Sequence, residues 1–159
     1  SVGVYLVHAA AHGPPQQSAD KPKVVMVEGF VPGRELTTTV MGDRALLVTD
    51  IMTTGWYDYD AKYKDGGSHH VVPAQIPDEI SEACLAYALR AHQALGCRGV
   101  TRTDFRWDEE RGLAGLFLLE TNTQPGMTPT SLVPEQAETF GYDFAALCQW
   151  MVEDASWHR

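Results

Sequence analysis

The pattern of apolar and polar positions along the chain predicts an antiparallel sheet. Runs rich in β-branched and aromatic residues end at turn residues such as Pro32-Gly33 and Gly42-Asp43, which is typical of strands joined by short turns. Because short turns connect antiparallel strands, we expect the first three strands to form a meander. The last two should form a hairpin across a polar connection at residues 108–112. The predicted strands are residues 23–31, 34–41, 45–51, 99–107 and 116–122.

Apolar residues at three- and four-residue spacing predict helices. The clearest helix is residues 77–95, which has acids in its first turn and Gly96 at its end. Two more are expected at residues 132–140 and 143–153. The positions expected to face the core are Ile80, Cys84, Tyr87, Ala88, Ala91 and Leu95, then Phe144, Leu147, Cys148 and Met151. The pattern predicts an α+β domain, with roughly five or six antiparallel strands and helices packed against them.

The last two predicted strands carry polar residues that can share one face of the sheet. Pairing Asp104 with Glu120 leaves Trp107 opposite Phe117, an apolar match that supports this register. Side chains alternate between the two faces of a strand. In this register four polar side chains share one face: Arg102, Asp104, Glu120 and Asn122.

These four side chains suit a metal-bound phosphate. Carboxylate and amide oxygens are ligands that a hard cation such as Mg2+ prefers. A guanidinium beside them can neutralise phosphate oxygens that gain charge during a reaction. The alternative is an exposed ion-pair cluster at the strand ends with no bound metal.

Composition is that of an ordinary globular protein, with 44% hydrophobic and 21% charged residues. The net charge of −9 argues against a nucleic-acid partner, and no apolar run approaches the length of a membrane span. The three cysteines lack metal-ligand spacing and are expected to be reduced core residues. We therefore expect one cytoplasmic domain that binds neither nucleic acid nor membrane.

Several motifs resemble a known enzyme family. R-x-D at residues 102–104 is followed about sixteen residues on by E-x-N-T-x-P-G-M-T and then by S-L-V-P at residues 131–134. This pattern resembles the carboxyl-terminal part of the D-alanine–D-alanine ligases, which are ATP-grasp carboxylate–amine ligases. The resemblance extends from Ser1 to about Glu153. Thr121 departs from the small or branched apolar residue that is more usual in the family.

The resemblance implies an ATP-grasp carboxyl-terminal lobe and ATP-dependent joining of two D-alanines for peptidoglycan. ATP would phosphorylate one D-alanine to an acyl phosphate, which the amine of the second would attack. The implied cofactors are ATP and two Mg2+ or Mn2+ ions, and the full-length enzyme is expected to be a homodimer. Because the chain opens inside the family's phosphate loop, we expect residues 1–159 to be a fragment that is inactive alone. The amino-terminal domain and the first half of the ATP-grasp region would be absent.

The resemblance also implies roles for individual residues. The metal ligands would be Asp104, Glu120 and Asn122. Nucleotide would meet the Glu28 carbonyl, the Val31 N–H, the Glu35 carboxylate, Lys62 and Ser1. Catalytic roles fall to Arg102 and the Gly126 N–H, which would stabilise an oxyanion, and to Tyr63, which would help close a loop over the site. The carboxylate of the second D-alanine would be received by Ser131 and the N–H of Leu132.

Simpler roles remain open for several of these residues. Glu35 can be an exposed hairpin residue, Lys62 a solvated lysine, and Ser131 the cap of the helix that follows it. The pair His69-His70 is expected to be a polar strand end. Two other functions are also open: an ATP-grasp ligase with a different nucleophile, and a nucleotide-binding module without catalysis.

Overall fold

The computed structural model describes residues 26–53 and 68–156, which fall in two compact units. The first unit comprises residues 1–30 and 53–68, and its described part is mainly residues 26–30, which are exposed and form no strand. The strand predicted at residues 23–31 is therefore wrong over its described part. Ser1, Lys62 and Tyr63 lie outside the described residues.

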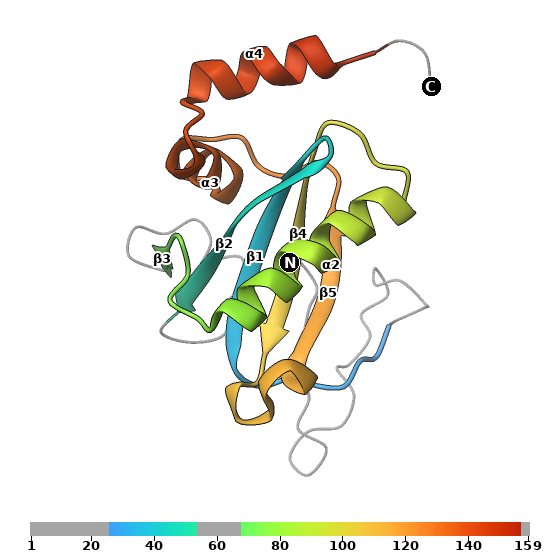
Figure 1. Ribbon diagram of the computed structural model, residues 1–159, viewed down its shortest axis with the longest axis vertical. Coiled ribbons are helices and arrows are strands. Elements are labelled where there is room, and N and C mark those ends of the chain that lie inside the picture. The colour runs from blue at the N-terminus through green and yellow to red at the C-terminus, as the bar shows by residue number, and fades with distance from the viewer. Residues whose placement is uncertain (1–25, 54–67, 157–159) are drawn as a thin grey trace, which may run out of the picture. The chain divides into compact units, whose positions relative to one another are not determined.

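The second unit, residues 31–52 and 69–159, holds the sheet (Figure 1). Its strands lie in the order β3-β2-β1-β4-β5, and the pairs β1/β2, β1/β4 and β4/β5 are antiparallel. The predicted α+β class is confirmed, but the meander is wrong: β1 pairs with β4 on the side where the first strand was expected. The strands are β1 (Arg34–Met41), β2 (Arg44–Thr53), β3 (Ser68–Val71), β4 (Val100–Trp107) and β5 (Leu116–Asn122).

One face of the sheet is covered by α2 (Asp78–Ala94) (Figure 1). The core here combines alternate residues of the strands with the inner face of the helix: Leu36, Val40, Val48, Phe105, Trp107, Ile80, Cys84 and Ala88. The helix prediction is confirmed, but two positions expected in the core are exposed, Tyr87 at 37% and Leu95 at 65%. His92 is buried instead. The helix therefore meets the sheet along a stripe narrower than its apolar composition suggests.

Two carboxyl-terminal helices, α3 (Leu132–Phe140) and α4 (Phe144–Asp154), pack together and close a second cluster. Gly141, with φ 115°, ends α3 in the left-handed conformation that glycine adopts readily. Leu147 is fully buried as expected, but Phe144 is 48% exposed, so that part of the prediction is wrong. This second cluster contains Met41, Leu46, Val100, Val133, Ala137 and Leu147.

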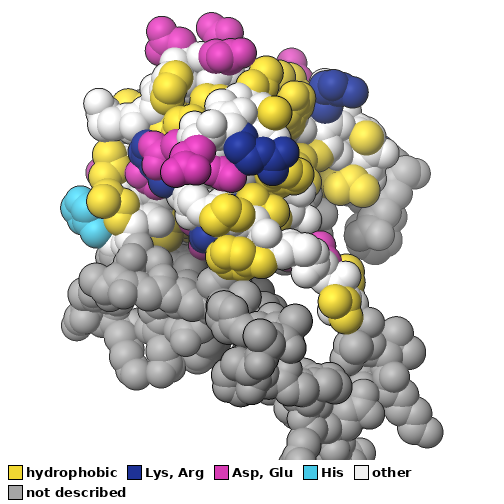
Figure 2. Space-filling model, turned by 90° about the horizontal axis from the view of Figure 1, so that it is seen from below, with side chains coloured by type: hydrophobic (Ala, Val, Ile, Leu, Met, Phe, Trp, Pro, Cys, Tyr) yellow, Lys and Arg dark blue, Asp and Glu magenta, His cyan; other side chains and the backbone are white. Residues whose placement is uncertain are grey.

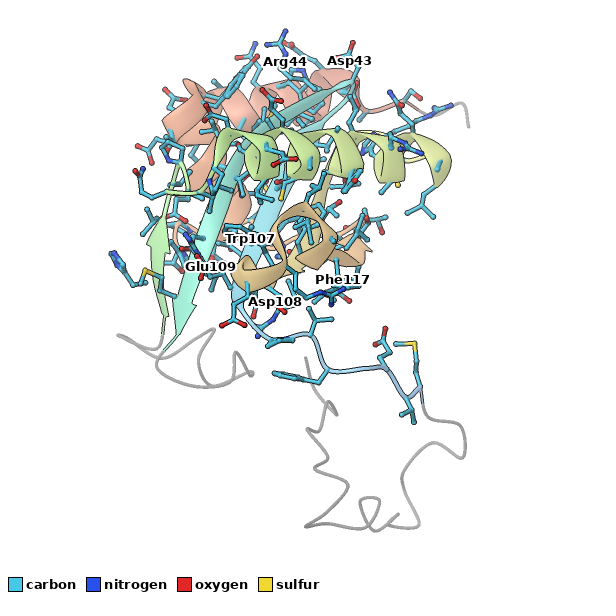
Figure 3. The ribbon with its side chains drawn as sticks, turned by 60° about the horizontal axis from the view of Figure 1, so that its bottom comes forward. Asp43, Arg44, Trp107, Asp108, Glu109 and Phe117 are labelled. Atoms are coloured by element: carbon cyan, nitrogen blue, oxygen red, sulfur yellow. The ribbon has the colours of Figure 1, made fainter. Side chains whose placement is uncertain are left out.

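The connection predicted at residues 108–112 forms two short 3-10 turns, together labelled η1 (Glu109–Gly115), which meet at a kink at Gly112 where β4 turns into β5. Trp107 donates its indole N–H to the Gly112 carbonyl at 3.0 Å and lies beside Glu109 (Figure 3). Arg34 pairs with buried Asp50 at 2.7 Å and with Glu109 at 3.2 Å. Acidic and basic side chains meet at this end of the unit (Figure 2). No helix within the described ranges is long and apolar enough to cross a membrane.

Candidate active site

The face of the sheet opposite α2 brings the predicted polar residues together. Asp104 pairs with Glu120 and Arg102 pairs with Asn122, which confirms the predicted register at this end. Because residues directly opposite one another in paired strands point to the same face, the four side chains lie on one side of β4 and β5. Glu120 is exposed, while the other three are partly buried.

The register prediction fails at the other end of the hairpin. Trp107 pairs with Leu116, and Phe117 pairs with Arg106, because the register shifts between Asp104 and Phe105. A shift of this kind inserts an extra residue in one strand and changes which side chains face each other beyond it. The polar group lies before the irregularity and keeps the pairing that its own spacing predicted.

Asp104 accepts hydrogen bonds from two side chains, Arg102 on its own strand and Thr37 on β1. Arg102 donates Nε to Oδ1 at 2.8 Å and Nη2 to Oδ2 at 2.7 Å, and both side chains are only about an eighth exposed, at 12% and 13%. Thr37 on β1 donates its hydroxyl to Oδ1 at 2.6 Å. Each carboxylate oxygen has two lone pairs. Both lone pairs of Oδ1 are thus used by these contacts, whereas Oδ2 keeps one that can face a cation.

The donor set that could hold a cation consists of two carboxylates and one amide. The described residues contain no group of three His, Cys, Asp or Glu side chains placed to hold a metal. The Asn122 Oδ1 atom accepts the backbone N–H of Gln124 at 2.9 Å, which orients the amide and leaves one lone pair on that oxygen. All three candidate donor atoms are oxygens, a set that would fit Mg2+ or Mn2+ better than a softer metal.

A second polar pair lies further along the same face. Arg106 donates to the Val31 carbonyl at 3.2 Å and to Glu35 Oε2 at 3.4 Å. Both predicted nucleotide contacts in this unit, Val31 and Glu35, are therefore joined by one guanidinium, and Glu35 is half-buried, not an exposed hairpin residue. Sequence reasoning did not assign Arg106 a role. The sequence nevertheless indicated where Arg106 would lie. Residues 102, 104 and 106 are two apart in a predicted strand and therefore point to the same face.

Glu28 belongs to the other compact unit and is exposed. Its predicted contact with adenine stays a prediction, as do the roles of Ser1, Lys62 and Tyr63.

The loop between β5 and α3 brings Gly126 against Ser131. A methyl group on Gly126 would lie 2.9 Å from the Ser131 hydroxyl oxygen, so only glycine fits without a shift. That hydroxyl accepts the Thr128 N–H at 3.0 Å and contacts the Thr128 hydroxyl at 2.8 Å. Ser131 stands at the N-cap position of α3 yet its side chain makes no capping hydrogen bond to the helix.

The first turn of α3 has two backbone N–H groups beside Ser131, those of Leu132 and Val133, because Pro134 has none. The first N–H groups of a helix have no partner within the helix and carry the positive end of its dipole. Leu132, whose N–H was predicted to bind a carboxylate, has its side chain buried at 7% exposure, which anchors the first turn. The geometry suits a carboxylate, and the alternative role of Ser131 as a side-chain cap has no bond to support it.

Two contacts that the sequence did not reveal hold α3 in place. His70 on β3 approaches Glu135 at 2.8 Å, so the residue expected to be only a polar strand end links two elements. Gln136 is fully buried and bonds to the backbone of β1. No local pattern could have found either contact, because the partners are 65 to 99 residues apart in the chain.

Almost the whole chain matches the model of a single protein family. The model described as "D-ala D-ala ligase C-terminus" matches residues 1–153. The D-alanine–D-alanine ligase of Roseobacter denitrificans is 75% identical over 159 residues, which are 100% of this chain and 50% of that protein. The ligase of Ruegeria sp. (strain TM1040) is 69% identical, covering 100% of this chain and 52% of that protein. The chain therefore spans about half the length of the curated relatives it matches.

The fold is also found in a solved structure of such a ligase. The D-alanine–D-alanine ligase of Bacillus anthracis, solved in complex with ATP, superposes with a TM-score of 0.64 at 28% identity. The match covers 79% of this chain and 40% of that one. The sheet and its helices are therefore similar to part of that larger protein.

Proposed function

This chain belongs to the D-alanine–D-alanine ligase carboxyl-terminal family, and from this premise we propose that it forms the carboxyl-terminal ATP-grasp lobe of an enzyme that joins two D-alanines with ATP. The observation that carries the proposal is the pairing of Arg102 and Asp104 with Asn122 and Glu120 across β4 and β5. This constellation lies inside a segment that matches the family throughout.

Nucleotide would be held by the strip of backbone before β1 and by the polar sheet face. Val31 and Glu35 are tied together by Arg106, so the adenosine contacts would be preorganised by one side chain. Lys62 and Ser1 would approach the phosphates, and Tyr63 would help close the site. A divalent cation held by Asp104, Glu120 and Asn122 would neutralise charge on the phosphate oxygens.

The residues of this chain would then act on the acyl phosphate of the first D-alanine. The amino end of α3, with Ser131 and the Leu132 N–H, would receive the carboxylate of the second D-alanine and aim its amine at the acyl carbon. Arg102 and the Gly126 N–H would stabilise the oxyanion of the tetrahedral intermediate, from which phosphate leaves. Arg102 is already oriented for this by its two bonds to Asp104.

The experiment that tests this function uses the full-length protein with ATP, Mg2+ and D-alanine. We expect phosphate release that requires D-alanine, with one D-alanyl-D-alanine formed per phosphate. Replacing the second substrate by D-lactate separates a dipeptide ligase from a relative with a hydroxyl nucleophile. Nucleotide binding without phosphate release under any of these conditions would refute the ligase and favour a binding module.

Assembly and location follow from the same proposal. We propose a cytoplasmic homodimer that acts on small molecules and contacts neither nucleic acid nor membrane. The three cysteines are free; Cys84 is buried as expected, whereas Cys97 and Cys148 are only partly buried, so their prediction as core residues is wrong. Sedimentation of the full-length protein would test the dimer.

A further inference from the structure

Gln136 fastens the middle of α3 to the backbone of β1. It is completely buried, and both ends of its amide are used. Oε1 accepts the Thr39 N–H at 2.8 Å, and Nε2 donates to the Thr37 carbonyl at 3.2 Å. A primary amide is well matched to this place, because it offers one acceptor and a donor side by side as a peptide group does.

The Thr39 N–H is available to Gln136 because the pairing of β1 with β2 is interrupted at this residue, whereas Thr37 remains paired with Thr49. The register shifts between Thr38 and Val40, and Thr39 has no partner residue in β2. Two residues of β2, Leu46 and Leu47, lie opposite Thr39 alone, so β2 carries an extra residue here. A buried N–H without a partner is costly, so the Thr39 N–H needs an acceptor from elsewhere. The Gln136 Oε1 atom supplies that acceptor.

The same stretch of β1 also contacts β4, the strand that carries the candidate metal ligand Asp104. Thr37 receives Gln136 through its carbonyl and donates its hydroxyl to Asp104 Oδ1 at 2.6 Å. A chain of three residues therefore runs from α3 through β1 to β4. Because a helix is a stiff element, fixing its middle at Gln136 also fixes its amino end, which carries Ser131.

We propose that Gln136 is a positioning residue that sets Ser131, the receiver of the second D-alanine, relative to Asp104 and the phosphate held there. This inference rests on the proposed function and goes beyond it, since Gln136 is not among the residues that would touch substrate. The requirement for such a device is chemical. The amine must stand within reach of an acyl carbon whose phosphate is held by a different strand, and a small misplacement lowers the rate strongly.

The test compares two variants of the full-length protein. Gln136→Leu removes the amide and keeps a similar volume. Ile80→Val is the matched control, because Ile80 is 1% exposed in the core under α2 and the change loosens packing away from the site. We expect Gln136→Leu to raise the KM for the second D-alanine about tenfold and to lower kcat, with the KM for ATP nearly unchanged. Ile80→Val should lower the Tm and leave all three constants as in the wild type.

A second variant, Gln136→Glu, adds a readout that loss of stability cannot imitate. When protonated, the introduced carboxyl group offers one donor and one acceptor, as the amide does; when ionised, it opposes the Thr37 carbonyl. The ratio of its KM for D-alanine to that of the wild type should be near one at the acid end of the activity range and rise with pH.

The outcomes distinguish a failure of the positioning role of Gln136 from a failure of the proposed ligase function. If Gln136→Leu lowers only the Tm, and the KM ratio of Gln136→Glu does not change with pH, the positioning role is refuted while the ligase stands. If the wild-type protein forms no dipeptide, the proposed function fails and this inference fails with it.

Discussion

Replacing Ser131 by alanine should weaken binding of the second D-alanine while hardly affecting the fold. The hydroxyl makes no capping bond to α3, and its backbone partner is the exposed Thr128 N–H, which water can satisfy instead. The loss of stability should therefore stay below about 0.5 kcal/mol, the level of ordinary surface substitutions.

The expected loss in binding is larger. A hydrogen bond from a hydroxyl to a carboxylate is worth about 1.5–3 kcal/mol, which corresponds to roughly a ten- to hundredfold rise in the KM for the second D-alanine. The KM for ATP should not change. Steady-state kinetics of the full-length protein at varied D-alanine, beside thermal unfolding, measures both quantities.

A true helix cap provides the control. Asp143 accepts the Ala146 N–H at 2.8 Å through its side chain at the start of α4. Asp143→Ala should lower stability by about 1 kcal/mol without changing the KM for D-alanine. If Ser131→Ala behaves like Asp143→Ala, with a lower Tm and an unchanged KM for D-alanine, the substrate role of Ser131 is refuted.

Three further predictions concern the metal face, the core and one titrating group. Glu120→Gln should weaken nucleotide binding about tenfold or more with Mg2+ present and leave binding without Mg2+ unchanged; equal titrations of variant and wild type in Mg2+ would contradict the ligand assignment. Thr38 has a buried hydroxyl without a partner among the described residues, so Thr38→Val should stabilise by about 1 kcal/mol in denaturant unfolding. Thr37→Val, which loses a bond to a carboxylate, should destabilise; stabilisation by both changes would contradict the hydrogen bond to Asp104. Burial lowers the pKa of His92 from 6.5, against smaller raising effects of Cys97 and Asp154. The unfolded chain then binds more protons below pH 6.5, so this part of the stability is complete above that pH and is lost on acidification. His92→Gln should therefore flatten the stability profile on the acid side of pH 6.5, and an unchanged slope would contradict this prediction.

The sequence alone was sufficient to predict the features that depend on residues close together in the chain, namely the bounds of several helices and strands. Helix α3 spans the predicted residues, and α2 and β1 begin and end within a residue or two of prediction. The pairing of Asp104 with Glu120 was also predicted correctly, although the apolar match of Trp107 with Phe117 that supported this register does not form. The motifs at residues 102–104 and 120–134 also carried the resemblance to the family, which is confirmed, whereas the metal role of this sheet face stays a prediction.

Burial was harder to predict than helix position. Tyr87 and Phe144 have apolar spacing on their helices, yet they are 37% and 48% exposed. Amphipathic spacing indicates the direction of a helix face, whereas the width of the covered stripe depends on how large a surface packs against it.

Only the tertiary structure decided which distant groups meet. Thr39 lacks a partner in β2 because β2 carries an extra residue at this point of the β1–β2 ladder, and its N–H is instead accepted by Gln136. Arg106 reaches Val31 across 75 residues of sequence in the same way. Such hydrogen bonds join groups whose local sequences are independent of each other. The candidate residues of the site could therefore be predicted from the sequence, but the long-range contacts that position them could not.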